Sequence, residues 1–402
     1  MNNGLLYQSE LLGASRTPPT TSRKGNQLLR LIRAAQPITR TEIAERLSID
    51  KSTVTENVKP LIASGIIRED SHAPEGQKRR SRMLSYVDDK TYFIGVNLGV
   101  RRSQVGLTTL GGEITDESDF ETPTSASYAL HLARERVDIL VRKYPERELG
   151  VIGVSVPGMT DALREKLIFA PNLDWKNIDI ASALRIHEGT RVVVENDSTA
   201  AAMFEARMKI RNSDDGLMTN FILVRSGTGI GVGLVIGSEV YRGTGAGRGI
   251  AGEFGHMTIV ANGKQCVCGN RGCWEKYASA ASAASLYLGD RPPQRGESVP
   301  KFVEIVSKAE VGDVRSKKTL ERVGDYLGIG IANVIMGIGI PRVIISGRLV
   351  YGWKFIEEPL NAAIKRSIIG KIDGWSVEAG EPVGSAIGGA LEIAVEEYLS
   401  TV

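Results

Sequence analysis

Hydrophobic residues recur at helical spacing in the first part of the chain. Over residues 26–35 they lie three and four positions apart, and Pro37 ends this first predicted helix. A second helix is predicted to begin at Thr39, because Thr39 and Glu42 have the spacing of a capping box. Residues 1–22 show no such period and contain clustered Ser, Thr and Pro, so we expect a flexible arm there.

A third helix and a hairpin complete this region. The apolar positions of the helix follow a helical period and are Val54, Val58, Leu61 and Ile62. Gly65 suits its C-terminal end, and Pro60 predicts a kink because proline removes a backbone hydrogen bond. The pattern over residues 66–87 changes to a hairpin with its turn at 74–76. Three short helices followed by a hairpin are typical of a winged helix-turn-helix.

Beyond residue 88, short buried strands alternate with longer helices. The predicted strands cover residues 92–97, 104–110, 150–157, 191–195, 220–225, 231–236 and 342–346. The predicted helices cover residues 126–144, 198–210, 277–288, 320–338, 353–366 and 386–399. This alternation predicts an α/β body with parallel elements.

Length and composition agree with a globular protein of two or three domains. The chain has 402 residues, of which 42% are hydrophobic and 24% charged, a balance that excludes wholesale disorder. No apolar run approaches the roughly 18 residues of a membrane span, and residues 1–21 lack the apolar segment of a signal peptide. We therefore expect a cytoplasmic protein.

Charge is divided unevenly along the chain. Residues 1–86 contain 14 Lys and Arg against 8 Asp and Glu, a net charge of +6. The remainder contains 36 against 39, a net charge of −3. A basic N-terminal module predicts a polyanionic partner for that part only, and a winged helix makes DNA the natural choice.

In such a module, short polar side chains at the start of the third helix can reach base edges, and basic side chains of the hairpin can meet phosphates. The candidate DNA contacts are Ser52, Thr53, Thr55, Lys59, Lys78, Arg79 and Arg80. The alternative interpretation is a three-helix protein-interaction module with a solvated basic turn.

All three cysteines of the chain lie close together in the sequence. Cys266, Cys268 and Cys273 follow His256 within 17 positions. Three thiolates and one imidazole match the ligands that tetrahedral zinc prefers, and four protein ligands leave no open position for an activated water. The pattern predicts one structural zinc per chain, whereas the alternative is a set of free thiols near a core histidine.

Two segments around these cysteines carry a longer motif. Residues 251–256 read Ala-Gly-Glu-Phe-Gly-His, and residues 266–275 read Cys-Val-Cys-Gly-Asn-Arg-Gly-Cys-Trp-Glu. With these segments the chain resembles the ROK family of repressors and sugar kinases over about residues 25–400. Its N-terminal region is similar to the NagC/XylR-type repressor branch of that family.

The resemblance implies an α/β fold in which a winged helix-turn-helix precedes a two-lobed, actin-like (ribonuclease-H-like) domain. The expected DNA-binding domain covers residues 23–88. The first lobe would combine residues 89–197 with 384–402, and the second lobe would cover residues 198–383 and include the zinc loop.

The resemblance also implies a sugar site between the lobes. The residues it assigns to sugar binding are Gly158, Asn172, Asn196, Asp197, Glu253, His256 and Glu275. In a kinase of this family, Asp197 would be the general base that deprotonates the attacking hydroxyl. A simpler alternative is that Asn196 and Asp197 only cap the helix that follows.

The nucleotide side departs from the family pattern. Residues 225–231 match the second, glycine-rich phosphate loop, but residues 97–102 do not match the first. Asn97 stands where ROK kinases have an aspartate that helps to hold magnesium, and Val100 and Arg101 replace small residues. We therefore expect no kinase activity.

These features together predict a sugar-responsive transcriptional regulator that acts as a repressor. Its expected partners are a pseudo-palindromic operator DNA, a sugar or sugar phosphate effector, and a second copy of the chain in a dimer or tetramer. The alternatives are a sugar kinase with an added DNA-binding head, favoured by Asp197, and an adaptor protein with a vestigial sugar site.

Overall fold

A computed structural model describes residues 23–401 except 73–80, 89, 213–219, 245–248, 250, 296, 381, 383 and 384. The predicted arm over residues 1–22 and the predicted hairpin turn at 74–76 lie outside the described residues. Among the helices of the described part, none is both long and apolar enough to cross a membrane.

The N-terminal region is a winged helix-turn-helix. Its elements are α1 (Arg23–Ala35), β1 (Ile38–Thr39), α2 (Arg40–Leu47), α3 (Lys51–Ala63), β2 (Ile67–His72) and β3 (Ser81–Tyr86). The three strands form an antiparallel sheet in the order β1-β3-β2. The capping box is confirmed, since the Thr39 hydroxyl accepts from the Glu42 amide at 3.2 Å and the Glu42 carboxylate accepts from the Thr39 amide at 2.8 Å.

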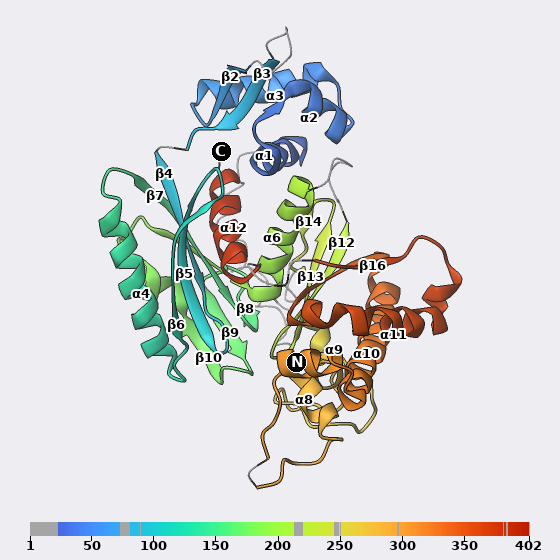
Figure 1. Ribbon diagram of the computed structural model, residues 1–402. Helices are drawn as coiled ribbons and strands as arrows, with labels where there is room; N and C mark the ends of the chain where they lie inside the picture. Colours follow the sequence, from blue (N-terminus) through green and yellow to red (C-terminus); the bar gives the residue numbers. More distant parts are fainter. Residues whose placement is uncertain are drawn as a thin grey trace, which may run out of the picture.

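A first five-stranded sheet lies below this domain in the order β11-β7-β4-β5-β6 (Figure 1). Its strands are β4 (Thr91–Asn97), β5 (Arg102–Thr109), β6 (Ile114–Glu121), β7 (Glu148–Val156) and β11 (Arg191–Asn196). Strands β4, β7 and β11 are parallel, and β5 and β6 extend the sheet in antiparallel fashion. A small antiparallel sheet and a short helix adjoin it: β8 (Met159–Thr160), β9 (Lys166–Ala170), β10 (Trp175–Asp179) and α5 (Ile180–Leu184).

Two helices cover opposite faces of the first sheet. Successive side chains of a strand point to opposite faces. Ile94 of β4 packs in the same apolar cluster as α4 (Ala126–Lys143), whereas its neighbour Phe93 packs in the cluster that contains α12 (Ser385–Leu399). The C-terminal helix therefore returns to complete the first lobe, on the face toward the centre of the molecule (Figure 1).

A second five-stranded sheet has the order β14-β13-β12-β15-β16. Its strands are β12 (Phe221–Ser226), β13 (Ile230–Ile236), β14 (Glu239–Val240), β15 (Arg342–Gly347) and β16 (Ser376–Ala379). The helices around it are α6 (Asp197–Asn212), α7 (Glu275–Ala278), α8 (Ser282–Tyr287), α9 (Phe302–Glu310), α10 (Val314–Ile338) and α11 (Trp353–Arg366), with 3-10 turns η2 (Glu253–His256), η3 (Arg348–Gly352) and η4 (Ile368–Lys371). Helix α6 packs against β13 on one side and α12 on the other, so α6 and α12 lie side by side between the two sheets (Figure 1).

Helix α1 joins the winged helix to this body. Leu28, Leu31 and Ile32 of α1 belong to the same buried apolar cluster as Met203 and Ile210 of α6. The winged helix is thus docked on the body through a shared core.

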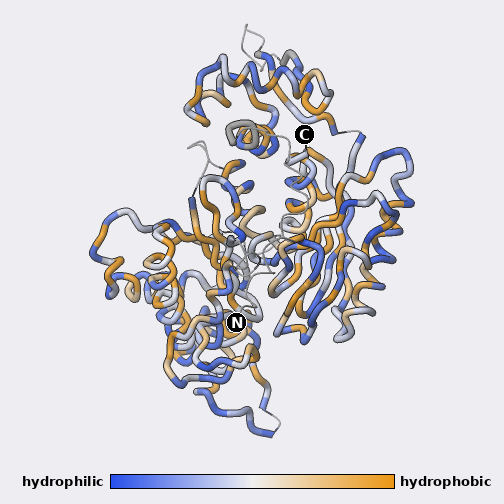
Figure 2. Tube along the Cα trace, turned by 180° about the vertical axis from the view of Figure 1, so that it is seen from behind, coloured by the Kyte–Doolittle hydropathy of each residue, from blue (hydrophilic) through white to orange (hydrophobic). Residues whose placement is uncertain are grey.

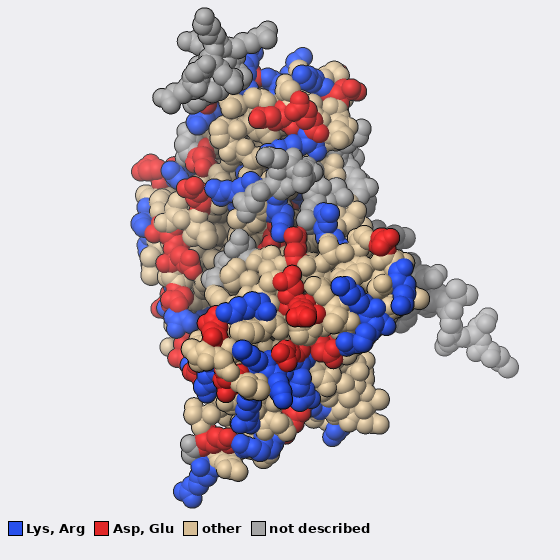
Figure 3. Space-filling view, turned by 45° about the vertical axis from the view of Figure 1, so that its right-hand side comes forward, with Lys and Arg blue, Asp and Glu red and all other residues tan. Residues whose placement is uncertain are grey.

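In the hydropathy view, apolar segments concentrate inside the lobes and polar segments on the outer helices and loops (Figure 2). On the face of the second lobe shown in Figure 3, basic and acidic side chains are interspersed.

The structure differs from the sequence prediction in several elements. The helix expected over residues 277–288 is divided into α7 and α8, because the chain turns at 279–281. Strand β6 was not predicted, since it is a largely exposed edge strand whose only fully buried residue is Phe120. Helix α3 continues through Pro60 to Ala63.

Candidate functional site

A cavity of about 590 Å³ lies between the two lobes, and we call it the interlobe cavity. Its walls contain all seven residues that the sequence assigned to sugar binding: Gly158, Asn172, Asn196, Asp197, Glu253, His256 and Glu275. The loops over residues 97–102 and 225–231 also line it. Residues from distant parts of the sequence therefore converge on one space.

Asn196 and Asp197 lie where β11 ends and α6 begins. The Asn196 side-chain oxygen accepts from the amides of Ser198 at 2.8 Å and Thr199 at 3.2 Å, so it does cap α6. Its amide nitrogen donates to the Gly158 carbonyl at 2.9 Å. Capping and lining of the cavity are thus compatible roles for the same side chain.

Asp197 has a partner that the sequence reasoning missed. Its carboxylate accepts from Arg225 Nη1 at 2.7 Å, across the cavity wall from the end of β12. The sequence indicates Arg225 only as part of a phosphate loop, because no local spacing connects positions 197 and 225. Asp197 therefore lines the cavity with Oδ2 paired with Arg225, while its Oδ1 accepts from the Ser198 hydroxyl at 3.2 Å.

Glu253 and Glu275 add two more carboxylates to the wall. Burial, followed by the negative charges of Asp197 and Glu275, raises the pKa of Glu253 to about 7. Glu275 is buried at the start of α7, and the second phosphate loop passes directly over it. A Cβ at Gly229 would lie 2.3 Å from a Glu275 carboxylate oxygen, so a larger residue at this position would have to displace the end of that side chain.

His256 connects the cavity to the cysteine cluster. The ligand atoms of His256, Cys266, Cys268 and Cys273 all lie within 4.8 Å of one another. The Cys266 sulfur lies 3.6 Å from His256 Nδ1, and the sulfurs of Cys268 and Cys273 are 3.7 Å apart. This arrangement fits a tetrahedral metal with one nitrogen and three sulfur ligands.

The same loop places Glu275. Its carboxylate lies 3.2 Å from the Cys266 sulfur and 3.9 Å from His256 Nδ1, while His256 Nε2 faces Glu253 at 3.9 Å. Burial raises the pKa of the Cys266 and Cys273 thiols, so these groups keep their protons until a cation replaces them. A metal in this cluster would stabilise the cavity wall.

Polar residues of the first phosphate loop make hydrogen bonds with other side chains of the first lobe. Asn97 is buried, accepts from the Ser155 hydroxyl at 3.0 Å and donates to Gln104 at 3.1 Å. Arg102 pairs with Asp119, and Arg101 is exposed. The carboxamide at position 97 is therefore held inside the sheet by hydrogen bonds on both sides.

The predicted DNA contacts divide into two groups. Ser52 and Lys59 on α3 are exposed, whereas Thr53 and Thr55 are half-buried, and the Thr55 hydroxyl donates to the Lys51 carbonyl at 2.8 Å. Lys78, Arg79 and Arg80 lie outside the described residues. Among the described residues, the predicted DNA-contact surface therefore consists of the exposed side of α3.

Comparison with known proteins identifies the two parts separately. Residues 93–396 match the ROK family, and residues 22–68 match a winged helix-turn-helix DNA-binding family. This chain belongs to the ROK family.

The ROK proteins that this chain is similar to include transcription regulators and glucokinases. The xylose repressor of Bacillus subtilis is 29% identical over 358 residues, which are 88% of this chain and 90% of that protein. The transcriptional dual regulator NagC of Escherichia coli is 28% identical over 347 residues, 83% of this chain and 82% of that protein. A solved ROK transcriptional regulator, a homologue of the E. coli MLC protein, superposes with a TM-score of 0.74 at 22% identity, covering 94% of this chain and 97% of that one.

The comparisons confirm the expected ROK repressor branch, the winged helix and the two-lobed fold. They also confirm the predicted class of protein, a sugar-responsive transcriptional regulator.

Proposed function

We propose that this ROK protein represses transcription by binding operator DNA through its winged helix, and that a sugar in the interlobe cavity changes this binding. The observation that carries the proposal is the course of α6. It begins at Asp197 in the cavity wall, and Met203 and Ile210 farther along pack against α1 of the winged helix. A shift of α6 on sugar binding would therefore reach the DNA-binding domain directly.

For DNA, we propose that Ser52, Thr53 and Thr55 contact bases and that Lys59 contacts phosphate. Lys78, Arg79 and Arg80 would add phosphate contacts from the hairpin. The protein would act in the cytoplasm as a homodimer on a pseudo-palindromic operator, with half-sites about 10 base pairs or a multiple apart. We propose a domain boundary near residue 88 and lobe boundaries near residues 197 and 384. The division of the strands between the two large sheets supports the lobe boundaries.

For the sugar, Asn196, Asp197, Glu253, His256 and Glu275 would hold hydroxyl groups, with Gly158 and Asn172 at the rim. Carboxylate and amide groups can take two neighbouring hydroxyls at once, and here they lie on a wall fixed by α6 and η2. We propose that one zinc ion per chain, held by His256, Cys266, Cys268 and Cys273, has the structural role of fixing this wall.

We further propose that the protein is not a kinase. Magnesium in such enzymes needs carboxylate oxygens, and position 97 offers a carboxamide already paired with Ser155 and Gln104. The carboxylate of Asp197, which the family resemblance assigns as the base in a kinase, is paired with Arg225. The alternative, an ATP-dependent sugar kinase with a DNA-binding head, would show turnover in a coupled assay with ATP and a panel of hexoses.

Gel-shift titrations of the full chain at several salt concentrations test the proposal. Arg79→Ala and Arg80→Ala should weaken DNA binding on all sequences and flatten the salt dependence, whereas Thr53→Ala should mainly relax sequence preference. A sugar panel added to the same titrations should contain at least one sugar that changes operator affinity. The proposal would be contradicted if all three variants bound DNA with the affinity and sequence preference of the wild type, or if no sugar changed operator affinity.

A further inference from the structure

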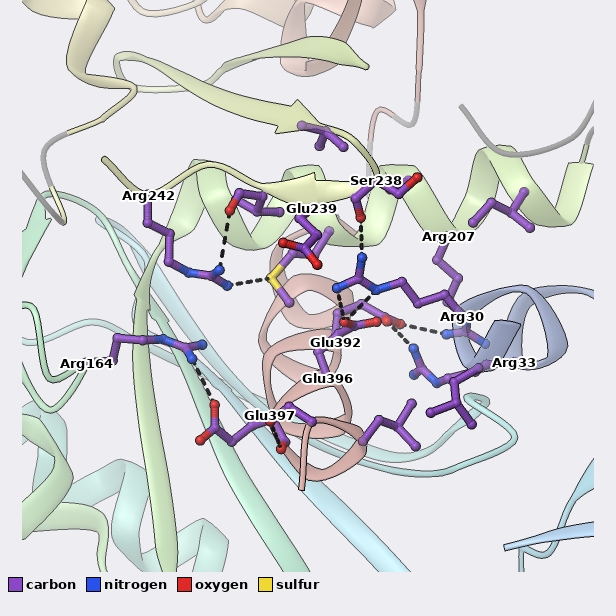
Figure 4. Close-up of a pocket in the computed structure, with 18 residues that line it drawn as sticks. Arg30, Arg33, Arg164, Arg207, Ser238, Glu239, Arg242, Glu392, Glu396 and Glu397 are labelled. Carbon is purple, nitrogen blue, oxygen red and sulfur yellow. Dashed lines mark hydrogen bonds and ion pairs between the residues drawn. The ribbon is translucent and has the colours of Figure 1, made fainter. Parts of the chain in front are cut away.

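A second cavity, of about 260 Å³, lies at the junction between the winged helix and the body. We call it the junction cavity. Its walls come from α1, α6, α12 and the β13–β14 turn, which Figure 4 shows converging on a group of charged side chains. Because α1 belongs to the DNA-binding domain, whatever occupies this cavity touches both parts of the protein.

Charged residues dominate the walls. The arginines are Arg30, Arg33, Arg164, Arg207 and Arg242. The carboxylates are Glu239, Glu392, Glu396 and Glu397. The lining therefore has one more positive charge than negative charges. Two residues outside the cavity pair with lining residues, Arg191 with Glu397 and Glu195 with Arg242, and they add one charge of each sign, so the excess is unchanged.

Most of these charges are arranged in pairs. Arg30 pairs with Glu396 at 2.8 Å, Arg164 with Glu397 at 2.8 Å, and Arg242 with Glu195. Glu239 is exposed at the rim. Arg30 and Arg242 therefore have carboxylate acceptors, whereas Arg164 is paired through Nη1 and keeps a buried Nε that has no hydrogen-bond partner among the described residues.

Glu392, like Glu195 and Glu397, is shared by two arginines, but only at Glu392 are both of these arginines almost completely buried. Arg33 of α1 donates to one of its oxygens, and Arg207 of α6 donates to the other at 2.8 Å (Figure 4). Arg33 and Glu392 are each only 3% exposed, and Arg207 is 11% exposed. Burial, together with the charge of Arg33, lowers the pKa of Arg207 in spite of Glu392. One buried positive charge therefore lacks a counter-charge in this triad.

The same two arginines have free donors. Arg33 Nε, Arg33 Nη2 and Arg207 Nε are buried and have no hydrogen-bond partner among the residues that the structure describes. A buried N–H without an acceptor is costly, and a guanidinium group matches a planar or tetrahedral oxyanion in geometry and charge. An oxyanion in the cavity would supply both the missing acceptor and the missing charge.

We propose that the junction cavity binds one small oxyanion, carried by a phosphate or a carboxylate group, on Arg33 and Arg207. The volume is below the range of roughly 300–1,000 Å³ of drug-sized sites, so the ligand is small. Glu392 and Glu396 confine it to the guanidinium side of the cavity. By linking α1 to α6, the anion strengthens the docking of the winged helix on the body.

Calorimetry of the full-length protein with inorganic phosphate and, separately, acetate tests this site, with chloride keeping ionic strength constant. We expect saturable binding of one anion per chain. Arg207→Gln removes a donor but leaves the Arg33–Glu392 pair balanced, so the chain should fold while anion affinity falls about tenfold or more. Arg366→Gln, at an exposed pair with Asp325, is the matched control and should leave anion binding unchanged.

A second variant separates this site from the interlobe cavity, which also holds arginines and a glycine-rich loop. Ala206→Leu adds bulk to the junction cavity and removes no charge, so it should reduce anion binding by a similar factor. Binding of phosphate alone or acetate alone would support the proposal and identify the chemistry. Absence of binding above chloride, or binding unaffected by both Arg207→Gln and Ala206→Leu, would overturn it and leave water as the acceptor.

Discussion

Glu253 and Glu392 each line a cavity of this protein, yet their surroundings shift their pKa values in opposite directions. Burial and two neighbouring carboxylates raise the pKa of Glu253 in the interlobe cavity to about 7. Burial also acts to raise the pKa of Glu392 in the junction cavity, but the charges of Arg33 and Arg207 outweigh it and hold that pKa below its usual value. Two glutamates of the same chain therefore differ in charge state and in the ligands they can accept, because their surroundings differ.

The difference indicates what each cavity can hold. A wall of carboxylates and amides around Glu253 offers acceptors and donors to a neutral ligand with many hydroxyls. The junction cavity, with two arginines on one carboxylate, is arranged around ions. The proposed division of roles is a neutral effector between the lobes and an ionic contact that holds the winged helix in place.

The largest effect is expected from a substitution that disrupts the interlobe cavity and leaves the junction cavity intact. Cys268→Ser should remove stoichiometric zinc, because structural zinc is worth about 10–16 kcal/mol in small domains and depends on every thiolate. Sugar binding should weaken with it, since Glu275 lies two residues after Cys273 and touches Cys266. Elemental analysis and calorimetry measure both, and Val267→Ala, at an exposed neighbour between two of the cysteines, is the control.

DNA affinity without sugar should stay near the original value in Cys268→Ser, since the winged helix docks at the other end of α6. Native protein without stoichiometric zinc would refute the metal site. Full zinc content in the Cys268→Ser variant would show that Cys268 is not a ligand.

The next largest effect is expected from a substitution that disrupts the buried charges of the junction cavity. Glu392→Gln leaves Arg33 and Arg207 buried without their shared counter-charge, which should cost about 3–5 kcal/mol of unfolding free energy. Glu310→Gln, at a pair with Lys354 in which both side chains are about half exposed, should cost less than about 1 kcal/mol. Urea unfolding of both variants measures the contrast. Equal stability of the two would mean that the buried triad does not hold the domains together.

The two cavities also differ in how far the sequence predicts them. His256 and the cysteines, or Asn196 and Asp197, lie in short motifs whose spacing carries information, and the structure brings them together as expected. Arg33, Arg207 and Glu392 are separated by more than 170 positions each, and nothing local distinguishes them from solvated helix residues. Only the packing of α1, α6 and α12 makes them a triad.

Secondary structure shows the same division. Strands β4, β7, β11 and β15 are predicted because they are buried on both faces and consist largely of apolar residues. Strand β6 is not, because an exposed edge strand needs no apolar period. The two-way split of the helix over residues 277–288 also follows from tertiary packing, since Ala280 donates its amide to the Ser226 hydroxyl on β12.

A smaller effect is expected from Asp197→Asn, which tests whether Asp197 binds the sugar. Asp197→Asn keeps the shape of the side chain but loses the charge that strengthens hydrogen bonds to sugar hydroxyls and the pair with Arg225. Sugar affinity should fall about tenfold or more, while DNA affinity without sugar stays near wild type. The variant would then be a repressor that ignores its effector. Calorimetry and gel shifts measure both, with Asp373→Asn, at an exposed position, as control.

An equal sugar response in Asp197→Asn and wild type would show that Asp197 only starts α6. ATP-dependent turnover by the wild type would instead show that Asp197 still serves as a base and that Asn97 does not prevent phosphoryl transfer.

The smallest effect concerns acid stability of the junction. The folded-state pKa of Glu392 is held below its unfolded value of about 4.3, so its contribution to stability is complete above that pH. As the pH falls between the two pKa values, the contribution should decrease by about 1.4 kcal/mol per pH unit. The difference in unfolding free energy between wild type and Glu392→Gln should therefore shrink below about pH 4. Because every other carboxylate titrates in both proteins, the difference isolates this one group. A difference that stays constant from pH 7 to pH 3 would mean that Glu392 is not ionised between the two arginines, and the contrast with Glu253 would then disappear.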